Sequence, residues 1–378
     1  MKLEQRQWTK AVGWTPSSTQ LKHTAQLALV FGSTAILSDR QRLQELRACY
    51  PAAHLFGCST AGEIYGTRVA DDSVVITAVQ FETTTVALAH TNIVECADSR
   101  AAGERLAKAL DPNGLVHAVV LSDGQRVDGS ELVRGVTAYL PRGVVVTGGL
   151  AGDGARFERT IVCVDDIAKE GEIGILGLYG SRLKVGYGSL GGWDPFGPER
   201  LITRSKGNVL YELDEQPALQ LYKKYLGEHA SGLPATGLLF PLSVRNATGD
   251  REVVRTILAV DEKEQSMTFA GDVPQGTYAR LMKANFDRLV EGAHGAAQTS
   301  YEALQSSSPD LAILISCVGR KLVLKQRTEE ELEAVRSVLG DGATLTGFYS
   351  YGEICPAAPN ANCELHNQTM TITTFSER

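Results

Sequence analysis

One pattern occurs three times in the chain and limits the folds that it can adopt. Each copy has a strand-like apolar run, a helical stretch and a second strand that ends in a glycine-containing turn. The three turns are residues 57–63, 148–153 and 347–353. Because repeated β-α-β units build sheets covered by helices, we predict an α/β fold with two domains, built from these units and their glycine-rich strand-end turns.

The position of the turns suggests a ligand site. Glycine allows positive φ and close backbone approach, and ligands of open α/β sheets bind at the carboxyl ends of strands. We therefore expect the three turns to converge on one or two related crevices, with Glu63, Asp153 and Glu353 as acidic side chains. The alternative is that the glutamates cap neighbouring backbone N–H groups.

Composition narrows the classes of partner. The chain has 378 residues, of which 43% are hydrophobic and 21% charged, with a formal net charge of -7 and no dense Lys/Arg run. This balance argues against nucleic acid as a partner. The N-terminus lacks an apolar signal core, and the apolar runs are too short for a membrane helix. We expect a cytoplasmic protein whose seven cysteines are mostly reduced core residues.

The first turn is similar to two known functional motifs, the nucleophile elbow and the phosphate loop, but matches neither. The turn reads G-x-S-x-x-G, one residue longer than the nucleophile elbow of hydrolases. Glu63 and Ile64 stand where a phosphate loop needs Lys and Ser/Thr. An acyl-transfer or hydrolytic enzyme using Ser59 or Cys58 remains the lesser alternative, because His54 lies too far along an extended strand to serve easily as the base.

Several motifs resemble a known family. The N-terminal FIST domain is suggested by "GCSTAGEI" at 57–64, "LSDG" at 121–124, "GGLAGD" at 148–153 and "GNVLYELDEQPALQLY" at 207–222. The FIST C-terminal domain is suggested by "GDVPQGTYARLM" at 271–282, "SCVGR" at 316–320 and "GFYSYGEICP" at 347–356.

The same resemblance, with the composition of the segments between the motifs, predicts the domain organisation. We expect a loosely attached N-terminal extension over residues 1–24, a FIST N-terminal domain over 25–209 and a FIST C-terminal domain over 210–378. The Gly-rich stretch 186–208 would form the transition between the two domains.

The resemblance implies a bacterial signal-input module that senses a small ligand and passes the result to a partner. Related stand-alone proteins include the haem-binding nitric oxide sensors called NosP, so the implied partner is a histidine kinase or a cyclic-di-GMP enzyme. The sequence predicts no oligomeric state. The predicted ligand-binding residues are Gly57, Ser59, Thr60, Gly62, Glu63, Asp123, Gly149, Gly152, Asp153, Arg320, Tyr349, Tyr351, Gly352 and Glu353.

Haem b is the cofactor that the resemblance implies, and it needs an apolar slot and an axial ligand. His366, which opens the last strand, is the first candidate, and His294, in an Ala- and Gly-rich helix, is the second. For both, ordinary contacts or close helix packing are the alternative. Zinc bound by Cys355, Cys363 and His366 is disfavoured, because the paired short intervals and the fourth ligand of a zinc site are missing.

A sensor of an amino acid or another small metabolite, without haem, is the main alternative function. Arg320, Asp123 and the two glutamates would then recognise the charged ends of the ligand. A salt bridge between Arg320 and Glu353 is the simpler interpretation of that arginine.

Overall fold

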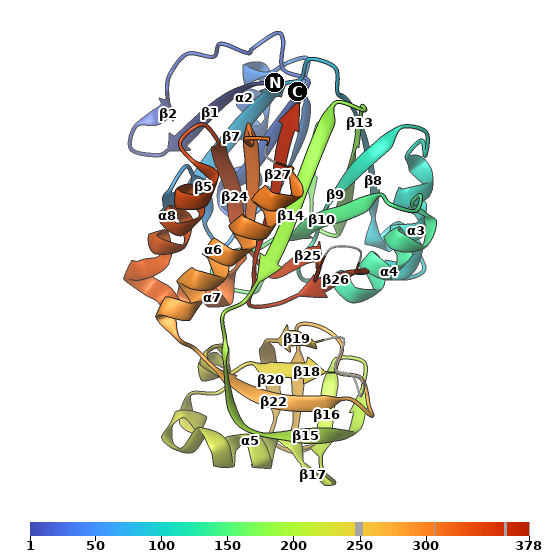
Figure 1. Ribbon diagram of the computed structural model, residues 1–378, viewed down its shortest axis with the longest axis vertical. Coiled ribbons are helices and arrows are strands. Elements are labelled where there is room, and N and C mark those ends of the chain that lie inside the picture. The colour runs from blue at the N-terminus through green and yellow to red at the C-terminus, as the bar shows by residue number, and fades with distance from the viewer. Residues whose placement is uncertain (246–251, 306, 359–360, 378) are drawn as a thin grey trace.

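A computed structural model describes residues 1–245, 252–305, 307–358 and 361–377. Figure 1 shows a large α/β body above a smaller, mainly β domain. The small domain begins with β15 (Asp194–Lys206) and ends with β22 (Tyr278–Lys283). The chain therefore leaves the body after β14 (Leu183–Leu190) and returns to it with α6 (Phe286–Ala303).

Among the described residues, the body contains three sheets with the same central order of four strands. The first two strands are the parallel pair of one sequence repeat, and the next two run antiparallel to their neighbours. The α/β prediction is confirmed. The three sets are β4 (His54–Ser59), β3 (Leu27–Gly32), β7 (Ser73–Gln80) and β1 (Lys2–Thr9); β10 (Val145–Leu150), β9 (Leu115–Ser122), β13 (Glu172–Tyr179) and β8 (Thr85–Asn92); and β24 (Thr344–Ser350), β23 (Leu311–Cys317), β27 (Met370–Glu377) and β14.

Short hairpins connect the three sheets in a cycle. The hairpin that follows each glycine turn pairs with the second repeat strand of another sheet, so the sheets form one body with pseudo-three-fold symmetry. The pairs are β5 (Glu63–Tyr65) and β6 (Arg68–Ala70) on β24, β11 (Val162–Val164) and β12 (Ile167–Lys169) on β4, and β25 (Gly352–Pro356) and β26 (Cys363–His366) on β10.

Helices cover the outer faces of the sheets, and apolar side chains from all three sheets meet inside. Phe31 and Phe348, for example, stack with their ring centroids 4.8 Å apart. The helices of the body are α1 (Thr34–Leu37), α2 (Arg40–Cys49), η1 (Ile93–Glu95), α3 (Ser99–Ala109), α4 (Gly129–Tyr139), α6, α7 (Val318–Leu324), η4 (Lys325–Arg327) and α8 (Thr328–Leu339).

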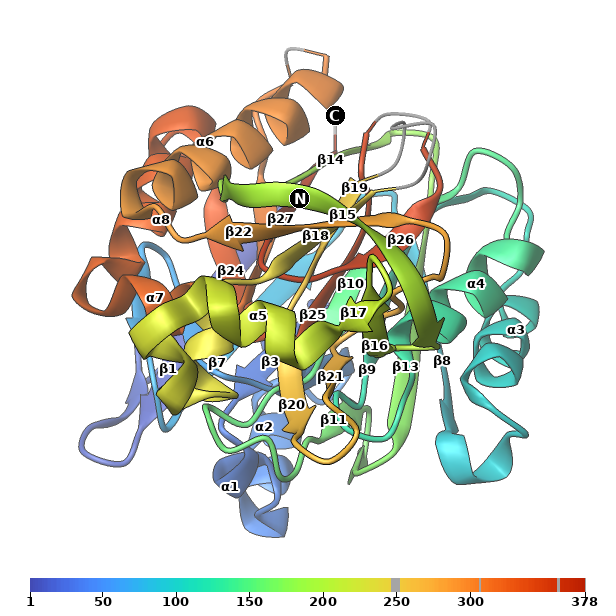
Figure 2. The ribbon, with the colours of Figure 1, turned by 90° about the horizontal axis from the view of Figure 1, so that it is seen from below.

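The small domain is a twisted antiparallel sheet with one longer helix, α5 (Ala218–Leu226), and two short helical segments, η2 (Gly227–Gly232) and η3 (Ala235–Leu239). Figure 2 shows this domain in front of the body. Its remaining strands are β16 (Val209–Leu213), β17 (Gln216–Pro217), β18 (Leu242–Arg245), β19 (Glu252–Arg255), β20 (Ile257–Asp261) and β21 (Ser266–Phe269).

Two expectations about the ends of the domains differ from the structure. Residues 1–24 are not loosely attached, because β1 pairs with β7 along its whole length and β2 (Gly13–Thr15) pairs with β1. The Gly-rich stretch 186–208 does contain the passage from the body to the small domain, between β14 and β15, but it is mostly strand rather than turn. Two of its glycines allow β14 to pack closely on α6, since a Cβ on Gly186 would lie 2.0 Å from the carbonyl oxygen of Ser300 and one on Gly188 would lie 2.3 Å from that of Ala296.

The three repeats need glycine at one shared position. A Cβ on Gly57, Gly148 or Gly347 would lie 1.7, 1.9 or 1.8 Å from a carbonyl oxygen of the neighbouring parallel strand. Gly148 and Gly347 also have φ of 151°. The second strand of each repeat can therefore approach the first only if this residue has no side chain.

We expect Gly347→Ala to lower the free energy of unfolding by at least about 2 kcal/mol, because the added methyl group overpacks the strand pair. Gly342→Ala is the matched control, since a Cβ there has nothing within 4 Å. Urea unfolding of both variants measures the difference. Equal stabilities would contradict the proposed need for glycine.

Candidate functional site

The three glycine turns meet in the body, as the repeat pattern predicts. One backbone hydrogen bond joins each turn to the next, so the turns form a closed ring. The bonds run from the N–H of Ala61 to the carbonyl of Tyr349 (2.8 Å), from Gly152 to Ser59 (2.9 Å) and from Tyr351 to Leu150 (3.2 Å). These residues occupy equivalent positions in the three repeats.

Protein groups surround the carboxylate of the first turn. Glu63 accepts hydrogen bonds from the hydroxyl of Thr60 (2.5 Å) and from the hydroxyl and N–H of Ser73 (2.8 and 3.2 Å). Its side chain is buried, and burial raises its pKa to about 7. Glu63 therefore ties the turn to the start of β7, as in the capping interpretation.

The third turn has the same network. Glu353 accepts from the hydroxyl of Ser350 (2.6 Å) and from the hydroxyl and N–H of Thr369 (2.9 and 3.2 Å). Complete burial raises the pKa of Glu353 to about 8. The same arrangement at two pseudo-symmetric positions shows that these carboxylates hold the turns together.

Asp123 and Asp153 organise loops in the second repeat. Asp123 accepts from the N–H groups of Gln125, Arg126 and Gly171 at 2.7 to 2.8 Å. Asp153 accepts from the N–H groups of residues 157–159 at 2.9 to 3.0 Å and from the hydroxyl of Tyr351. Asp153 thereby fixes both its own loop and the aromatic side chain of the third turn.

Arg320 is completely buried and its contacts are with protein groups. It pairs with Glu331 at 3.2 Å, not with Glu353 as the simpler interpretation had it, and donates to the carbonyl of Leu289 (2.6 Å). The guanidinium therefore joins α7, α8 and α6. Tyr349, also buried, lies below the turn with its ring 5.8 Å from the ammonium group of Lys321.

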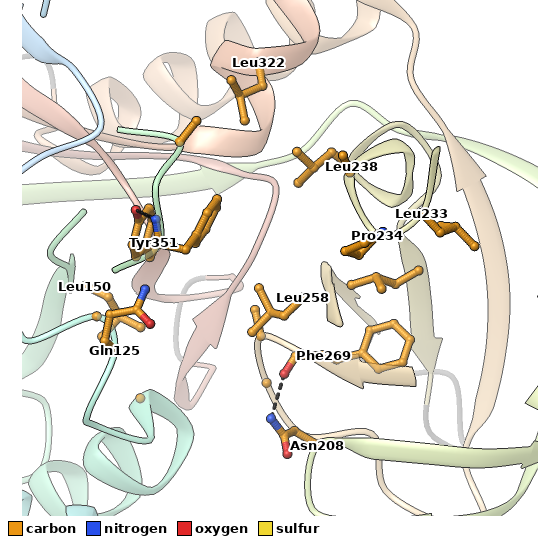
Figure 3. A pocket seen from close by; sticks show the side chains of 18 of the residues that line it. Gln125, Leu150, Asn208, Leu233, Pro234, Leu238, Leu258, Phe269, Leu322 and Tyr351 are labelled. Atoms are coloured by element: carbon orange, nitrogen blue, oxygen red, sulfur yellow. Dashed lines mark hydrogen bonds between the residues drawn. The ribbon is translucent and has the colours of Figure 1, made fainter. Parts of the chain in front are cut away.

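A large cavity lies between the body and the small domain, with a volume of about 1080 Å³. Figure 3 shows Gln125, Leu150 and Tyr351 on the body side, opposite Leu258 and Leu233 of the small domain. The body contributes residues 124–129, 155, 157 and part of α7, and the small domain contributes residues 232–236, 238–239, 257–258 and 269–272 with Asn208. The volume is slightly above the usual range for small-molecule sites.

The lining of the cavity is mostly apolar. Its charged side chains, apart from Lys325, are held by other groups of the described protein. Phe157 and Leu258 expose 36% and 44% of their surface, unusually much for large apolar residues. Arg126 pairs with Glu170 at 2.5 Å, and Asp272 pairs with Arg134 at 2.8 Å. Lys325, at the end of α7, has no ion-pair partner among the described residues.

Only one of the predicted ligand-binding residues, Tyr351, lines this cavity. Asp123 precedes the cavity loop 124–129, and Asp153 orients Tyr351 from behind. The other predicted residues lie in the buried turn ring or, for Arg320, between helices. The cavity wall from the small domain was not identified in the sequence, because its apolar residues resemble ordinary core residues.

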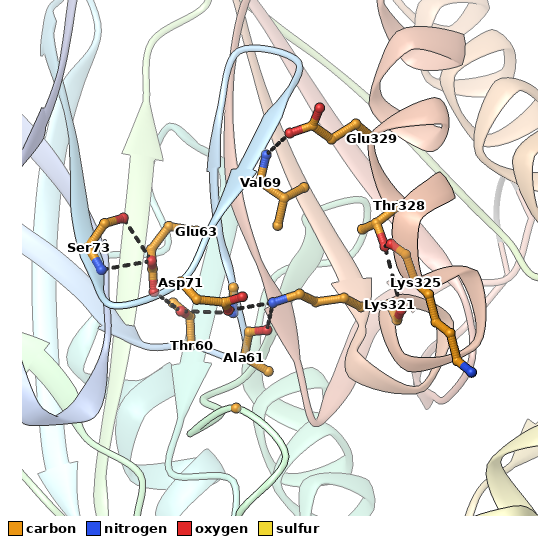
Figure 4. A network of polar contacts seen from close by, with 12 residues as sticks. Thr60, Ala61, Glu63, Val69, Asp71, Ser73, Lys321, Lys325, Thr328 and Glu329 are labelled. Carbon is orange, nitrogen blue, oxygen red and sulfur yellow. Dashed lines mark hydrogen bonds and ion pairs between the residues drawn. The ribbon is translucent and has the colours of Figure 1, made fainter. Parts of the chain in front are cut away.

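Lys321 is a second residue that the sequence did not single out. Its ammonium group donates to the carbonyl of Ala61 (2.8 Å) and pairs with Asp71 (2.5 Å), as Figure 4 shows. A Cβ on Gly62 would lie 2.6 Å from this nitrogen. Lys321 therefore covers the first turn and leaves no space there for a ligand.

The haem candidates lie outside the cavity. The ring Nε2 of His366 is 2.8 Å from the carbonyl oxygen of Cys355, and its side chain is buried. His294 is exposed on α6, while neighbouring Gly292 packs on Gly191, where a Cβ would lie 2.7 Å from the carbonyl oxygen. The Ala- and Gly-rich patch is thus filled by the chain itself.

The cavity lining does not fit haem ligated by histidine or cysteine, because the described lining contains neither residue. Tyr351 is there, but its hydroxyl donates to Asp153. Within the described ranges, no group of three or more His, Cys, Asp or Glu side chains could hold a metal ion. None of the described helices is long and apolar enough to cross a membrane.

Ser59 and Cys58, the candidate nucleophiles, are completely buried. The hydroxyl of Ser59 accepts from the N–H of Ile161 at 2.8 Å, and burial raises the pKa of the Cys58 thiol well above its ordinary value. His54 lies at the other end of β4, 3.1 Å from Asp165. The contacts of Ser59 are therefore those of a residue that joins the end of β4 to the segment just before β11.

The buried glutamates predict a pH dependence of stability. A raised pKa in the folded state means that folding retains a proton that the unfolded chain has released, so stability falls as pH rises. Burial lowers the pKa of His117 to about 3, so this side chain makes stability rise with pH. Its effect is confined to pH values below about 6.5, because above that pH the histidine is neutral in the unfolded chain as well. From pH 6.5 to 7.5 the free energy of unfolding should therefore fall, by up to about 1.4 kcal/mol per pH unit for each retained proton.

Glu353→Gln should flatten this slope, and Glu333→Gln, at an exposed position of α8, should leave it unchanged. Urea unfolding across this pH range is the measurement. An unchanged slope in Glu353→Gln would show that Glu353 does not retain the proton.

Comparisons with known proteins agree with the motif resemblance. Residues 26–216 match the FIST N domain, and residues 218–356 match the FIST C domain. The chain is 24% identical over 208 residues to an uncharacterized protein of Methanocaldococcus jannaschii; the match covers 50% of this chain but only 38% of that relative. The chain also aligns with the crystal structure of a cyanuric acid hydrolase from A. caulinodans, at 11% sequence identity. The alignment covers 78% of this chain and 99% of the hydrolase chain. Its TM-score of 0.18 is too low to indicate a shared fold.

FIST domains are associated with the sensing of small ligands in signal transduction. The two family matches follow one another and together extend over most of the chain. The boundary between them, near residue 217, falls inside the small domain, so the family division and the spatial division differ. The protein belongs to the FIST family, with a FIST N domain followed by a FIST C domain.

Proposed function

We propose that this protein is a cytoplasmic sensor that binds a small, largely apolar ligand in the cavity between the body and the small domain. The observation that carries the proposal is the cavity of about 1080 Å³, whose walls come from both parts of the chain. Phe157 and Leu258 expose apolar surface to water, which is unfavourable in free energy. A bound apolar ligand would cover this surface and remove the penalty.

A ligand in this position can change the relation of the two parts. It contacts both, and so stabilises the arrangement in which both walls reach it. Three sets of contacts among the described residues hold the two parts together and would adjust with the ligand. Arg134 in α4 pairs with Asp272 of the small domain, and Arg255 donates to the carbonyl of Leu365. Where the chain crosses between the parts, an apolar cluster is formed by Trp193, Met282, Leu289, Val323 and Leu324. The proposed output is a changed surface for a partner, and a coupling of 1 to 3 kcal/mol would be typical of such a switch.

The partner proposed from the resemblance is a histidine kinase or a cyclic-di-GMP enzyme. The apolar lining favours an apolar ligand over an amino acid. Arg320, which was expected to bind the carboxylate of an amino acid, is buried against Glu331 away from the cavity.

We expect Leu258→Asn to weaken binding of the neutral fluorophore N-phenyl-1-naphthylamine about tenfold, because a leucine surface is lost from the contact. Leu201→Asn is the control: Leu201 is exposed in the same domain, at 36%, but does not line the cavity. Fluorescence titration gives both dissociation constants. Equal affinities in the two variants would place the fluorophore elsewhere and contradict the proposed site.

Haem b with a response to nitric oxide stays a prediction of the resemblance to the NosP sensors. It requires a Soret band in protein expressed with iron and a haem precursor, and loss of that band in His366→Ala or His294→Ala. Protein that binds the neutral fluorophore in the cavity but never shows a Soret band would contradict the haem prediction and leave the apolar-ligand proposal intact.

A further inference from the structure

A second pocket, of about 410 Å³, lies where α3 and α4 of the body meet β26 and the small domain. Three arginines line it: Arg100 of α3, Arg134 of α4 and Arg255 of β19. The Arg134–Asp272 ion pair lies between this pocket and the interdomain cavity, because Asp272 lines the cavity and Arg134 lines the pocket.

Close helix packing brings the first two arginines together. A Cβ on Gly135 of α4 would lie 2.1 Å from the carbonyl oxygen of Arg100, and a Cβ on Gly103 of α3 would lie 2.3 Å from that of Leu132. The two helix backbones therefore touch, and Arg100 and Arg134 border the same hollow. Two glycines at the crossing are needed for this approach.

The third arginine comes from the small domain and is held in place. Arg255 is buried, and its guanidinium donates to the carbonyl of Leu365 in β26 (3.1 Å) and to that of Asp272 (3.0 Å). A positive charge is thus fixed at the pocket wall, where two parts of the molecule meet.

A buried hydroxyl in the same pocket has no partner. Ser130 of α4 is 8% exposed, and its Oγ has no hydrogen bond among the described residues. Buried hydroxyl groups are nearly always hydrogen-bonded. A ligand oxygen in the pocket could accept a hydrogen bond from the Ser130 hydroxyl and so satisfy it.

More basic than acidic side chains line the pocket. Glu364 is the one acidic side chain among the described lining residues, against three arginines. Arg134 is neutralised by Glu131 and Asp272. Arg100 is 55% exposed and holds its partner Glu104 only at 3.7 Å, so it can turn toward a ligand.

We propose that this pocket binds a small anion that carries a phosphate or a carboxylate group. Guanidinium groups bind both through paired N–H donors, and Ser130 supplies a further donor. The site is separate from the interdomain cavity, so it does not depend on the apolar ligand proposed there.

Calorimetric titration of the full chain with inorganic phosphate and with succinate, at low ionic strength, tests the site. We expect saturable binding of at least one anion, with the stronger of the two indicating the ligand class. Arg100→Gln should raise its dissociation constant about tenfold, since a charged hydrogen bond is lost. Ser130→Ala should raise it by about threefold or more, and Glu364→Gln should lower it.

Arg105→Gln is the matched control. Arg105 lies on the same helix, is also 55% exposed and pairs with a surface glutamate at 3.4 Å, but it does not line the pocket. The Arg105→Gln variant should bind the anion with the same affinity as the unaltered protein. The proposal is wrong if neither anion binds saturably, or if Arg105→Gln weakens binding as much as Arg100→Gln does.

Discussion

The hydrogen-bonded ring of three strand-end turns is the constraint on which the rest of the structure depends. Each repeat can place its turn in the ring only because a glycine lets its second strand approach the first. The ring in turn directs each hairpin onto the sheet of another repeat. Each repeat therefore contributes a strand pair to the sheet of another repeat, and the three repeats form a single body.

The pseudo-symmetry is broken where the candidate site lies. Lys321 covers the first turn, whereas Leu150 of the second turn and Tyr351 of the third reach the interdomain cavity. The small domain, which occurs between the second and third repeats in the sequence, supplies the facing wall. The interdomain cavity is thus formed where an inserted domain lies against an internally repeated scaffold.

The sequence was sufficient to predict the repeats, the α/β class and the meeting of the turns, because glycine spacing and alternating apolar runs are local signals. It did not distinguish carboxylates that hold a turn from carboxylates that bind a ligand. Part of what holds Glu63 and Glu353 comes from outside the turn motifs: the hydroxyl of Ser73, at the start of β7, and that of Thr369, just before β27. The apolar wall around Leu233 and Leu258 was missed because its exposure depends on packing between domains rather than on residue type.

Backbone hydrogen exchange with and without bound N-phenyl-1-naphthylamine tests the central claim most directly, since ligand contacts slow the local opening that exchange requires. If the ligand lies between the two parts of the molecule, exchange should slow in residues 124–129 of the body and in residues 232–239 of the small domain, and should not change in residues 57–63. Slower exchange in only one of the two walls, or in residues 57–63 alone, would contradict an interdomain ligand site.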